Sequence, residues 1–356
     1  MLQVKEAAPF RGGLCRLAGV NPLGDTRLMW SDWTQTGDSM KILIIGAAGM
    51  LGRKLTASLL ANPLWPDLTL VLADVVAPAP VAGAQCLTVD LASPATATTL
   101  IAHRPDVIFH LAAIVSGDAE VNFDKGYTIN LDASRWLFDA IRAQPGYCPR
   151  LVFASSCAVI GTPFPDVVGD DFHLTPRTSY GTQKAMTELL LADYSRRGMF
   201  DGIGLRLPTI CIRPGLPNLA ASGFFSNILR EPLVGKPAIL PVRDSLRHWF
   251  ASPRAAVGFL RHAAVVDTAP MDQNRSLNMP GLSATVAEQI EALRRVAGQK
   301  AVDLIQLTPD PAIAVIVEAW ARAFNPARAL AMGFTADHSF DAIIQAHIAD
   351  EMGGTV

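Results

Sequence analysis

One stretch of sequence decides the fold: Lys41-Ile42-Leu43-Ile44-Ile45-Gly46-Ala47-Ala48-Gly49-Met50-Leu51-Gly52. Its first five residues include an apolar, β-branched run that is typical of a buried strand. The glycines then lead directly into a helical stretch, Arg53 to Asn62. Glycines at this spacing allow a tight turn and close packing of a helix on a strand. The order strand, turn, helix presents a helix N-terminus, with free N–H groups and a positive dipole end, to a phosphate.

More apolar runs follow this unit and are separated by helical stretches: Thr69 to Ala73, Cys86 to Val89, Val107 to Leu111, Leu151 to Ala154 and Gly202 to Leu207. Continuous apolar strands that alternate with helices indicate a parallel sheet with both faces covered. The sequence therefore predicts an α/β fold with a doubly wound parallel sheet of the Rossmann type over residues 40–210.

Residues 211–356 are predicted to form mainly a smaller C-terminal substrate-binding lobe, with some segments that return to the Rossmann domain. Proline and glycine crowd together after Pro208, and the strand–helix alternation loosens. Two helix starts are expected in this part. Thr285 with Glu288 has capping-box spacing, and Ser252-Pro253 pairs a cap residue with proline at the first helical position. Residues 1–39 show neither a strand nor a helix period and are predicted to lie outside the fold.

The composition excludes several classes of protein. The 356 residues carry 30 basic and 32 acidic side chains. This balance lacks the excess of positive charge that is typical of proteins that bind nucleic acid or an anionic membrane. No apolar run approaches the ~18 residues that cross a bilayer. The five cysteines are scattered without ligand spacing, which favours a reduced compartment and no metal. We therefore expect a cytoplasmic protein with no nucleic-acid or membrane partner.

The ends of the next strands indicate the cofactor. Asp74 ends the second strand, where a carboxylate accepts hydrogen bonds from an adenosine ribose and repels a 2′-phosphate. NAD is therefore favoured over NADP, although Asp74 could also merely end the strand. Asp90-Leu91 follows the third strand, where the carboxylate could meet the adenine amino group. Leu111-Ala112-Ala113 follows the fourth, and its small residues let the backbone run beside a cofactor. His110 is expected to be a packed core histidine.

A possible catalytic pair lies on the helix after the fifth strand. Tyr180 and Lys184 are four residues apart, so their side chains share one helix face and the ammonium can approach the phenol. Lowering the pKa of a tyrosine from about 10 to about 7 requires roughly 4 kcal/mol of preferential phenolate stabilisation. We expect Lys184 and an oxidised nicotinamide to supply it. Ser155 and Ser156 end the fifth strand at the ligand-binding edge of such a sheet.

Taken together, these motifs and Leu207-Pro208-Thr209 resemble the extended short-chain dehydrogenase/reductase superfamily, in its NAD-dependent epimerase/dehydratase-like branch, over about residue 40 to the C-terminus. The resemblance implies that Tyr180 is the general acid/base and that Lys184 tunes it and holds the nicotinamide ribose. It assigns the substrate oxygen to Ser156, because Ser156 stands three residues before Val159 as in the family pattern.

The resemblance also implies further site residues. Asn130 matches the asparagine that supports a proton path, and Ile160 departs from the usual tyrosine, so a substrate contact from that phenol is missing. The predicted cofactor-binding residues are Gly46, Gly49, Met50, Leu51, Gly52, Asp74, Asp90, Leu91, Leu111, Ala112, Ala113, Asn130, Tyr180, Lys184 and Pro208. The family commonly pairs subunits through the helix that carries the tyrosine, so a homodimer is expected.

The substrate class rests on a narrower resemblance. Segments around Ser116, Arg206 to Ile210, Arg247 and Ala329 to Phe334 are similar to the D-erythronate dehydrogenase group, which implies oxidation of the C2 hydroxyl of a four-carbon sugar acid. Ser116, Ser156, Tyr180 and Arg247 would then contact the substrate. Arg247 is the first choice for the cation that binds its carboxylate, since an arginine fork suits that group; Arg213 is the second. A nucleotide-sugar epimerase or dehydratase with tightly held NAD, and a non-catalytic NAD sensor, stay as alternatives.

Overall fold

The computed structural model describes residues 39–215 and 221–354. The predicted N-terminal extension therefore lies outside the described residues apart from Ser39, whose hydroxyl is 2.9 Å from that of Thr69. The central feature is a seven-stranded sheet with the order β10-β6-β5-β4-β1-β2-β3, in which every neighbouring pair is parallel. Its strands are β1 (Met40–Ile45), β2 (Leu68–Asp74), β3 (Ala84–Thr88), β4 (Val107–His110), β5 (Arg150–Ser156), β6 (Asp201–Leu207) and β10 (Ser276–Asn278). The predicted Rossmann sheet is confirmed.

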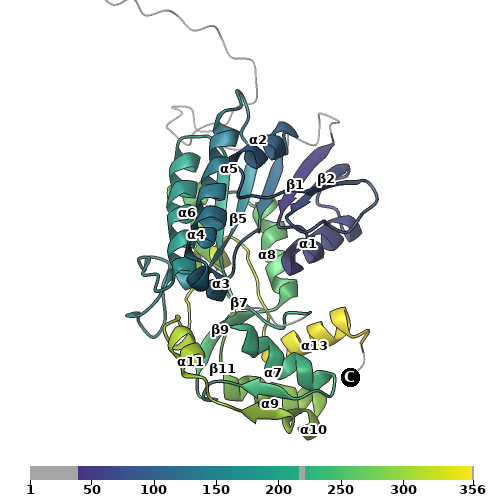
Figure 1. Ribbon diagram of the computed structural model, residues 1–356, viewed down its shortest axis with the longest axis vertical. Helices are drawn as coiled ribbons and strands as arrows, with labels where there is room; N and C mark the ends of the chain where they lie inside the picture. The colour runs from purple at the N-terminus through teal and green to yellow at the C-terminus, as the bar shows by residue number, and fades with distance from the viewer. Residues whose placement is uncertain (1–38, 216–220, 355–356) are drawn as a thin grey trace, which may run out of the picture.

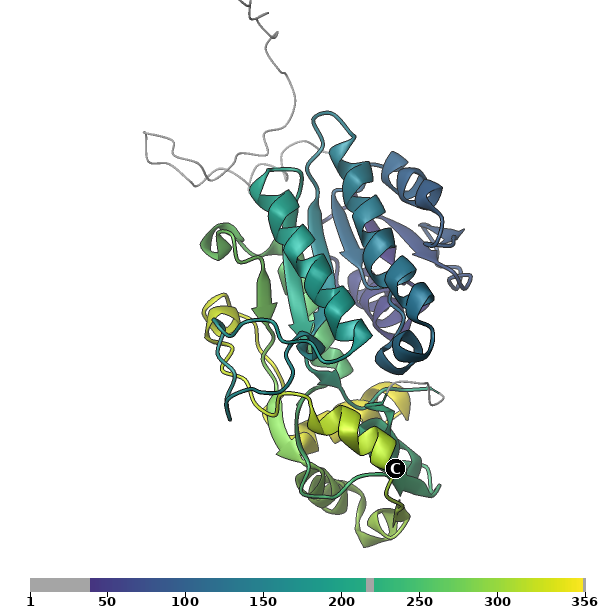
Figure 2. The ribbon, with the colours of Figure 1, turned by 60° about the vertical axis from the view of Figure 1, so that its left-hand side comes forward.

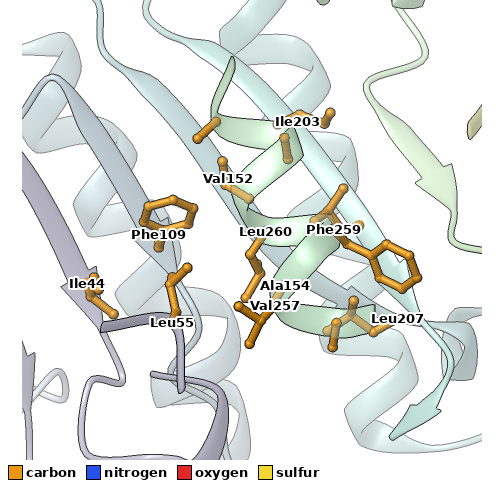
Figure 3. Packing of buried hydrophobic residues seen from close by; sticks show 14 of the residues in the cluster. Ile44, Leu55, Phe109, Val152, Ala154, Ile203, Leu207, Val257, Phe259 and Leu260 are labelled. Carbon is orange, nitrogen blue, oxygen red and sulfur yellow. The ribbon is translucent and has the colours of Figure 1, made fainter. Parts of the chain in front are cut away.

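Helices cover both faces of this sheet (Figure 1). α1 (Met50–Ala61) and α8 (Pro253–Val265) pack on one face, whereas α2 (Pro94–Ala102), α5 (Ala133–Arg142) and α6 (Ser179–Arg196) pack on the other. Alternate residues of β1 point to opposite faces: Ile42 and Ile44 join the core under α1, and Leu43 and Ile45 join the core under α5. Figure 3 shows the first core, where Leu260 of α8 lies close to the buried strand residues. Burial on both faces explains why the strands read as continuous apolar runs.

The predicted helix starts are confirmed in detail. The Ser252 side chain accepts a hydrogen bond from the N–H of Ala255 at the start of α8. Thr285 and Glu288 form the reciprocal capping box of α9 (Val286–Ala297). α1 begins three residues earlier than predicted, at Met50, because the last glycine of the turn already belongs to the helix.

A smaller lobe lies beyond the carboxyl ends of the central strands (Figures 1 and 2). Its sheets are β11-β9-β7 and β12-β8, built from β7 (Thr209–Ile210), β8 (Ala238–Leu240), β9 (Arg247–Ala251), β11 (Leu282–Thr285) and β12 (Ile305–Leu307). Its helices are α7 (Gly223–Leu233), α9, α10 (Gln299–Val302), α11 (Pro311–Glu318) and α13 (Phe340–Glu351). A separate core that includes Phe225, Phe250 and Trp320 holds the lobe together.

The lobe and the sheet share one stretch of backbone. β6 ends at Leu207, Pro208 follows, and β7 then pairs with β9 in the lobe. In the other direction, β10 and α8 come from the C-terminal part of the chain but join the central sheet and its core, as does α12 (Ala327–Ala331) through the buried Ala329. The predicted domain boundary at residue 210 stays a prediction.

Within the described residues, no helix combines the length and apolar character needed to cross a membrane. In the same part of the chain, no cluster of three or more His, Cys, Asp or Glu side chains could hold a metal ion.

Candidate active site

The glycine turn joins β1 to α1 at the point where the strand order reverses, between β1 and β4. Gly46 has φ +92°, and a Cβ there would lie 2.6 Å from the backbone nitrogen of Ala112. A Cβ on Gly52 would lie 2.2 Å from the carbonyl oxygen of Gly46. Neither position tolerates a side chain, so the turn packs against both its own helix and the loop after β4. Gly49 is the N-cap residue and makes no side-chain cap, so the N–H groups at the start of α1, including those of Met50 and Leu51, lack intrahelical acceptors.

Asp74 is half-buried at the end of β2 and lies against the glycine turn. Its carboxylate accepts hydrogen bonds from the N–H of Ala48 at 2.9 Å and of Val76 at 3.2 Å. These donors fix the Asp74 carboxylate beside the glycine turn, where the predicted ribose contact would need it. Asp90 lies after the end of β3, is exposed, and accepts from the N–H of Ala92 at 2.9 Å. Leu91 beside it is partly buried.

The loop after β4 forms the other wall of this crevice. The N–H groups of Leu111 and Ala112 both donate to the carbonyl of Ile45, at 2.8 and 3.0 Å. Ala113 follows as a partly buried small residue, and Ser116 begins α3 (Ser116–Val121). His110 is buried, and its Nε2 lies 2.9 Å from the Ser134 hydroxyl. The predicted core histidine is confirmed.

Asn130 holds this loop in place. It lies in a π-helical turn, η2 (Thr128–Asp132), that follows α4 (Phe123–Tyr127). Its side chain accepts from the Ile114 N–H at 2.8 Å and donates to the Ile114 carbonyl at 3.0 Å and to Gln183 at 2.7 Å. The side chain of Asn130 therefore ties the loop after β4 to α6, and these three bonds do not include Lys184.

Tyr180 and Ser156 lie together. Tyr180 is half-buried in the first turn of α6, where the Thr178 side chain caps the helix. Ser156 ends β5, accepts from the N–H of Ala158 at 3.1 Å, and interacts with the Tyr180 side chain. Ser155, by contrast, donates to Glu188 at 2.5 Å in the core. The geometry therefore distinguishes the two serines, and the one adjacent to Tyr180 is Ser156.

Lys184 lies where the helix spacing predicts, one turn from Tyr180. It does not, however, lower the pKa of Tyr180 as expected. It is 1% exposed, and its Nζ donates to the Ala154 carbonyl at 2.8 Å, 5.7 Å from the centroid of the Tyr180 ring. Burial lowers the pKa of Lys184 to about 7, opposed by Glu188. Burial also raises the pKa of Tyr180 to about 12; Ser156 and Arg213, rather than Lys184, act to lower it. Lys184 is thus not among the groups that lower the pKa of Tyr180 here, and its expected role in acidifying the phenol together with an oxidised nicotinamide stays a prediction.

The two candidate arginines differ in their surroundings. The Arg247 guanidinium donates to the Ser283 carbonyl at 3.0 Å and forms an ion pair with Glu288 at 3.2 Å. Arg213 lies within electrostatic range of Tyr180, and its side chain donates to the Ile210 carbonyl at 3.1 Å. Arg247, the first choice for the substrate-binding cation, therefore pairs with the capping residue of α9, whereas Arg213, the second choice, lies within electrostatic range of Tyr180.

Sequence reasoning missed one buried polar pair where the lobe meets the sheet. Pro208 is buried between β6 and β7, and the hydroxyl of the next residue, Thr209, lies 2.7 Å from His248 Nε2. The His248 ring stacks on Phe225, and burial lowers its pKa to about 3. No residue spacing could have signalled this contact, because it joins positions 39 residues apart.

The residues present fit a dinucleotide. The glycine turn forms a cradle that any Cβ would fill, a helix N-terminus opens on it, and the Asp74 carboxylate is fixed beside it. Gly46, Gly49, Met50, Leu51, Gly52 and Asp74 would hold the pyrophosphate and ribose. The fold and site define a dinucleotide-binding enzyme with a tyrosine, a serine and a lysine at the carboxyl edge of its sheet.

The chain is similar to known proteins in sequence and in fold. Residues 42–256 match the model of the NAD dependent epimerase/dehydratase family. D-erythronate dehydrogenase from Cupriavidus necator is 47% identical over 87% of this chain and 98% of that protein. D-erythronate dehydrogenase from Haemophilus influenzae is 42% identical over 88% of this chain and 100% of that protein. A crystal structure described as the nucleoside-diphosphate-sugar epimerase from Agrobacterium tumefaciens is 60% identical, covers 89% of this chain and 96% of that chain, and superposes with a TM-score of 0.86.

The chain belongs to the NAD dependent epimerase/dehydratase family. It is an NAD-dependent oxidoreductase, as the resemblance to extended short-chain dehydrogenases implied.

Proposed function

We propose that this chain oxidises the C2 hydroxyl of D-erythronate to the corresponding 2-oxo acid. The observation that carries the proposal is the coincidence of a Ser156–Tyr180 pair at the sheet edge with full-length similarity to proteins named D-erythronate dehydrogenases. When bound, NAD supplies the hydride acceptor and, in its oxidised form, a positive charge.

The side chains of the site would carry out proton removal, hold the reacting oxygen and bind the nicotinamide ribose. Tyr180 Oη removes the proton of the C2 hydroxyl, and Ser156 holds the oxygen on which charge develops. Tyr180 must be ionised to act as a base, and its raised pKa of about 12 favours the protonated phenol at neutral pH. The positive charge of Arg213 favours the phenolate. Lys184 packs beneath the tyrosine and would hold the nicotinamide ribose.

Arg213 is also our choice for the cation that binds the substrate carboxylate. It lies near Tyr180, while Arg247 is engaged with Glu288. The experiment compares Arg213→Met with Arg247→Met. Arg213→Met should raise the KM for D-erythronate at least about tenfold, the loss of roughly 1.4 kcal/mol of binding, and Arg247→Met should leave KM nearly unchanged. The reverse order would restore the sequence-based choice of Arg247.

A nucleotide-sugar epimerase is the second candidate, supported by the description of the 60% identical structure. The two functions differ in their net reaction: a dehydrogenase releases NADH, whereas an epimerase returns the hydride. Purified protein is therefore assayed for NADH absorbance with a panel of four-carbon and six-carbon sugar acids, and separately with UDP-sugars. Net NADH from D-erythronate supports our proposal. Epimerised UDP-sugar without net NADH would refute it.

We further propose that the protein is a homodimer that pairs through α4 and α6. Helices α3, α4 and α6 pack together and expose apolar side chains: Val121 is 79%, Phe123 55% and Leu189 65% accessible. Light scattering after gel filtration should show a dimer for the natural sequence and a monomer for Leu189→Arg. A monomeric natural protein would contradict the pairing.

A further inference from the structure

The last three residues of β5, Ala154 to Ser156, each contact a side chain of α6. Tyr180, Lys184 and Glu188 are spaced four residues apart on α6, so they share one face of the helix. Tyr180 interacts with Ser156, Lys184 with the Ala154 carbonyl, and Glu188 with the Ser155 hydroxyl. Two of these three helix residues belong to the proposed reaction, and the third, Glu188, has no assigned role.

Glu188 is an unusual residue for this position because it is a carboxylate only 4% exposed. Arg206 of β6 neutralises it in a bidentate pair, in which Nη2 donates to Oε2 at 2.8 Å and Nε donates to Oε1 at 3.1 Å. Arg206 is itself only 7% exposed and also donates to Asn278 of β10 at 3.2 Å. Ser155, Arg206 and Asn278 are register partners on three adjacent strands, so the network crosses the sheet directly behind the site.

A buried ion pair of this kind is weak evidence for stability, since well-packed apolar residues often replace such pairs without loss. Its location suggests a different role. The groups that face the Lys184 ammonium are Tyr180 and Glu188 from its own helix, His110 from β4, and the Phe153 ring, whose centroid is 4.6 Å away. Among the ionisable groups acting on Lys184, Glu188 is the one that raises its pKa, and burial keeps His110 neutral.

We propose that Glu188 is a positioning residue that favours the protonated form of the buried Lys184 and holds the end of β5 in register with Tyr180. This inference rests on the proposed function, in which Lys184 and Tyr180 serve the reaction. Arg206 and Ser155 fix the carboxylate, so the negative charge stays one helical turn from Lys184 and cannot turn toward solvent.

The direct test measures the protonation of Lys184 without cofactor or substrate. Protein with ¹³Cε-labelled lysine is titrated by NMR, and the Lys184 signal is assigned by its loss in Lys184→Arg. Glu188→Gln should move the titration midpoint of Lys184 down by at least about one pH unit. The matched control is Glu291→Gln, which removes a charge from an exposed pair with Arg294 on α9 and should leave the midpoint unchanged.

A second variant covers the case in which Glu188→Gln leaves Arg206 buried and unpaired and does not fold. Glu188→Met with Arg206→Met removes both charges, and the midpoint should still fall. An unchanged midpoint in the variant that folds would overturn the inference.

Kinetics then separate this inference from the proposed function. The alkaline limb of the kcat/KM profile for D-erythronate should move to lower pH in parallel with the midpoint. A moved midpoint in a protein whose natural sequence oxidises no sugar acid refutes the proposed function but supports the electrostatic role of Glu188. An alkaline limb that stays in place while the midpoint moves would overturn the positioning role.

Discussion

In the proposed reaction, Tyr180 acts through a single oxygen atom, that of its phenol. The phenol lies beside Ser156 at the edge of the sheet, and its pKa is raised mainly by burial. Replacing Tyr180 by phenylalanine keeps the ring and its packing but removes the group that accepts the proton.

Tyr180→Phe should therefore reduce kcat by at least about a thousandfold, within the upper part of the range for loss of a general base. Affinity for NAD, measured by calorimetry, should change less than about threefold. Parallel loss of NAD binding and turnover would show that the phenol serves the cofactor site rather than the chemistry.

We expect Asp74 to determine the preference for NAD over NADP through its charge. The carboxylate is fixed by the N–H groups of Ala48 and Val76, so it cannot move away from a 2′-phosphate. Asp74→Asn should lower the ratio of kcat/KM for NAD to that for NADP by about tenfold or more, because one repulsive charge is removed. Asp90→Asn is the control, and it should leave this ratio unchanged.

Individual site residues were predictable where a backbone motif fixes them. The glycine turn, Asp74 and the serine adjacent to Tyr180 lie where strand ends and helix spacing place them. The roles of Arg213, Thr209 and Glu188 depend on interactions with residues distant in the sequence: Tyr180 for Arg213, His248 for Thr209 and Arg206 for Glu188. The lowered pKa of Lys184 was not predictable either, since it depends on burial rather than on spacing.

At the level of elements, the Thr285–Glu288 capping box fixes the start of helix α9. The Thr285 hydroxyl accepts from the Glu288 N–H at 3.1 Å, and the Glu288 carboxylate accepts from the Thr285 N–H at 2.6 Å. Thr285→Ala should reduce the free energy of unfolding by about 1 kcal/mol, measured by urea denaturation. The kcat should stay unchanged, because the cap belongs to the lobe; a large loss of kcat would instead connect the Glu288–Arg247 pair to catalysis.

Most elements of the central sheet were predictable because β1, β2, β4, β5 and β6 are largely buried on both faces and form continuous apolar runs, whereas the edge strand β3 is only partly buried. β10 and the lobe strands were not, because they have two to five residues each and show no period. Their positions depend on pairing with distant strands, β6 for β10 and β7 for β9. Local sequence carries no information about such partners.

For the whole molecule, acid stability depends on buried neutral histidines. Burial, aided by Lys184, lowers the pKa of His110 from 6.5 to about 3. Between these two pH values the unfolded chain binds a proton that the folded protein does not. The contribution of neutral His110 to the free energy of unfolding is therefore fully present above pH 6.5 and is lost as the pH falls toward 3.

His110→Phe removes this contribution. Between pH 7.5 and pH 5, the free energy of unfolding of the natural protein should fall by about 2 kcal/mol more than that of the variant. His248 remains in both proteins, so its own titration cancels. Equal pH dependence in urea titrations of the two proteins would show that His110 is protonated in the folded state.

The attachment of α6 to β5 constrains how this sequence can vary. An α-helix turns by about 100° per residue, so one residue inserted between Tyr180 and Glu188 would carry Glu188 away from Ser155 and Arg206, and Lys184 with it if the insertion preceded Lys184. Substitutions on the outer side of this helix keep the four-residue spacing of Tyr180, Lys184 and Glu188. An insertion or deletion between them breaks at least one of their contacts with β5. Related chains can therefore exchange side chains on the outer side of this helix, apart from those at the proposed subunit contact around Leu189, but the length of the segment is a fixed property of the molecule.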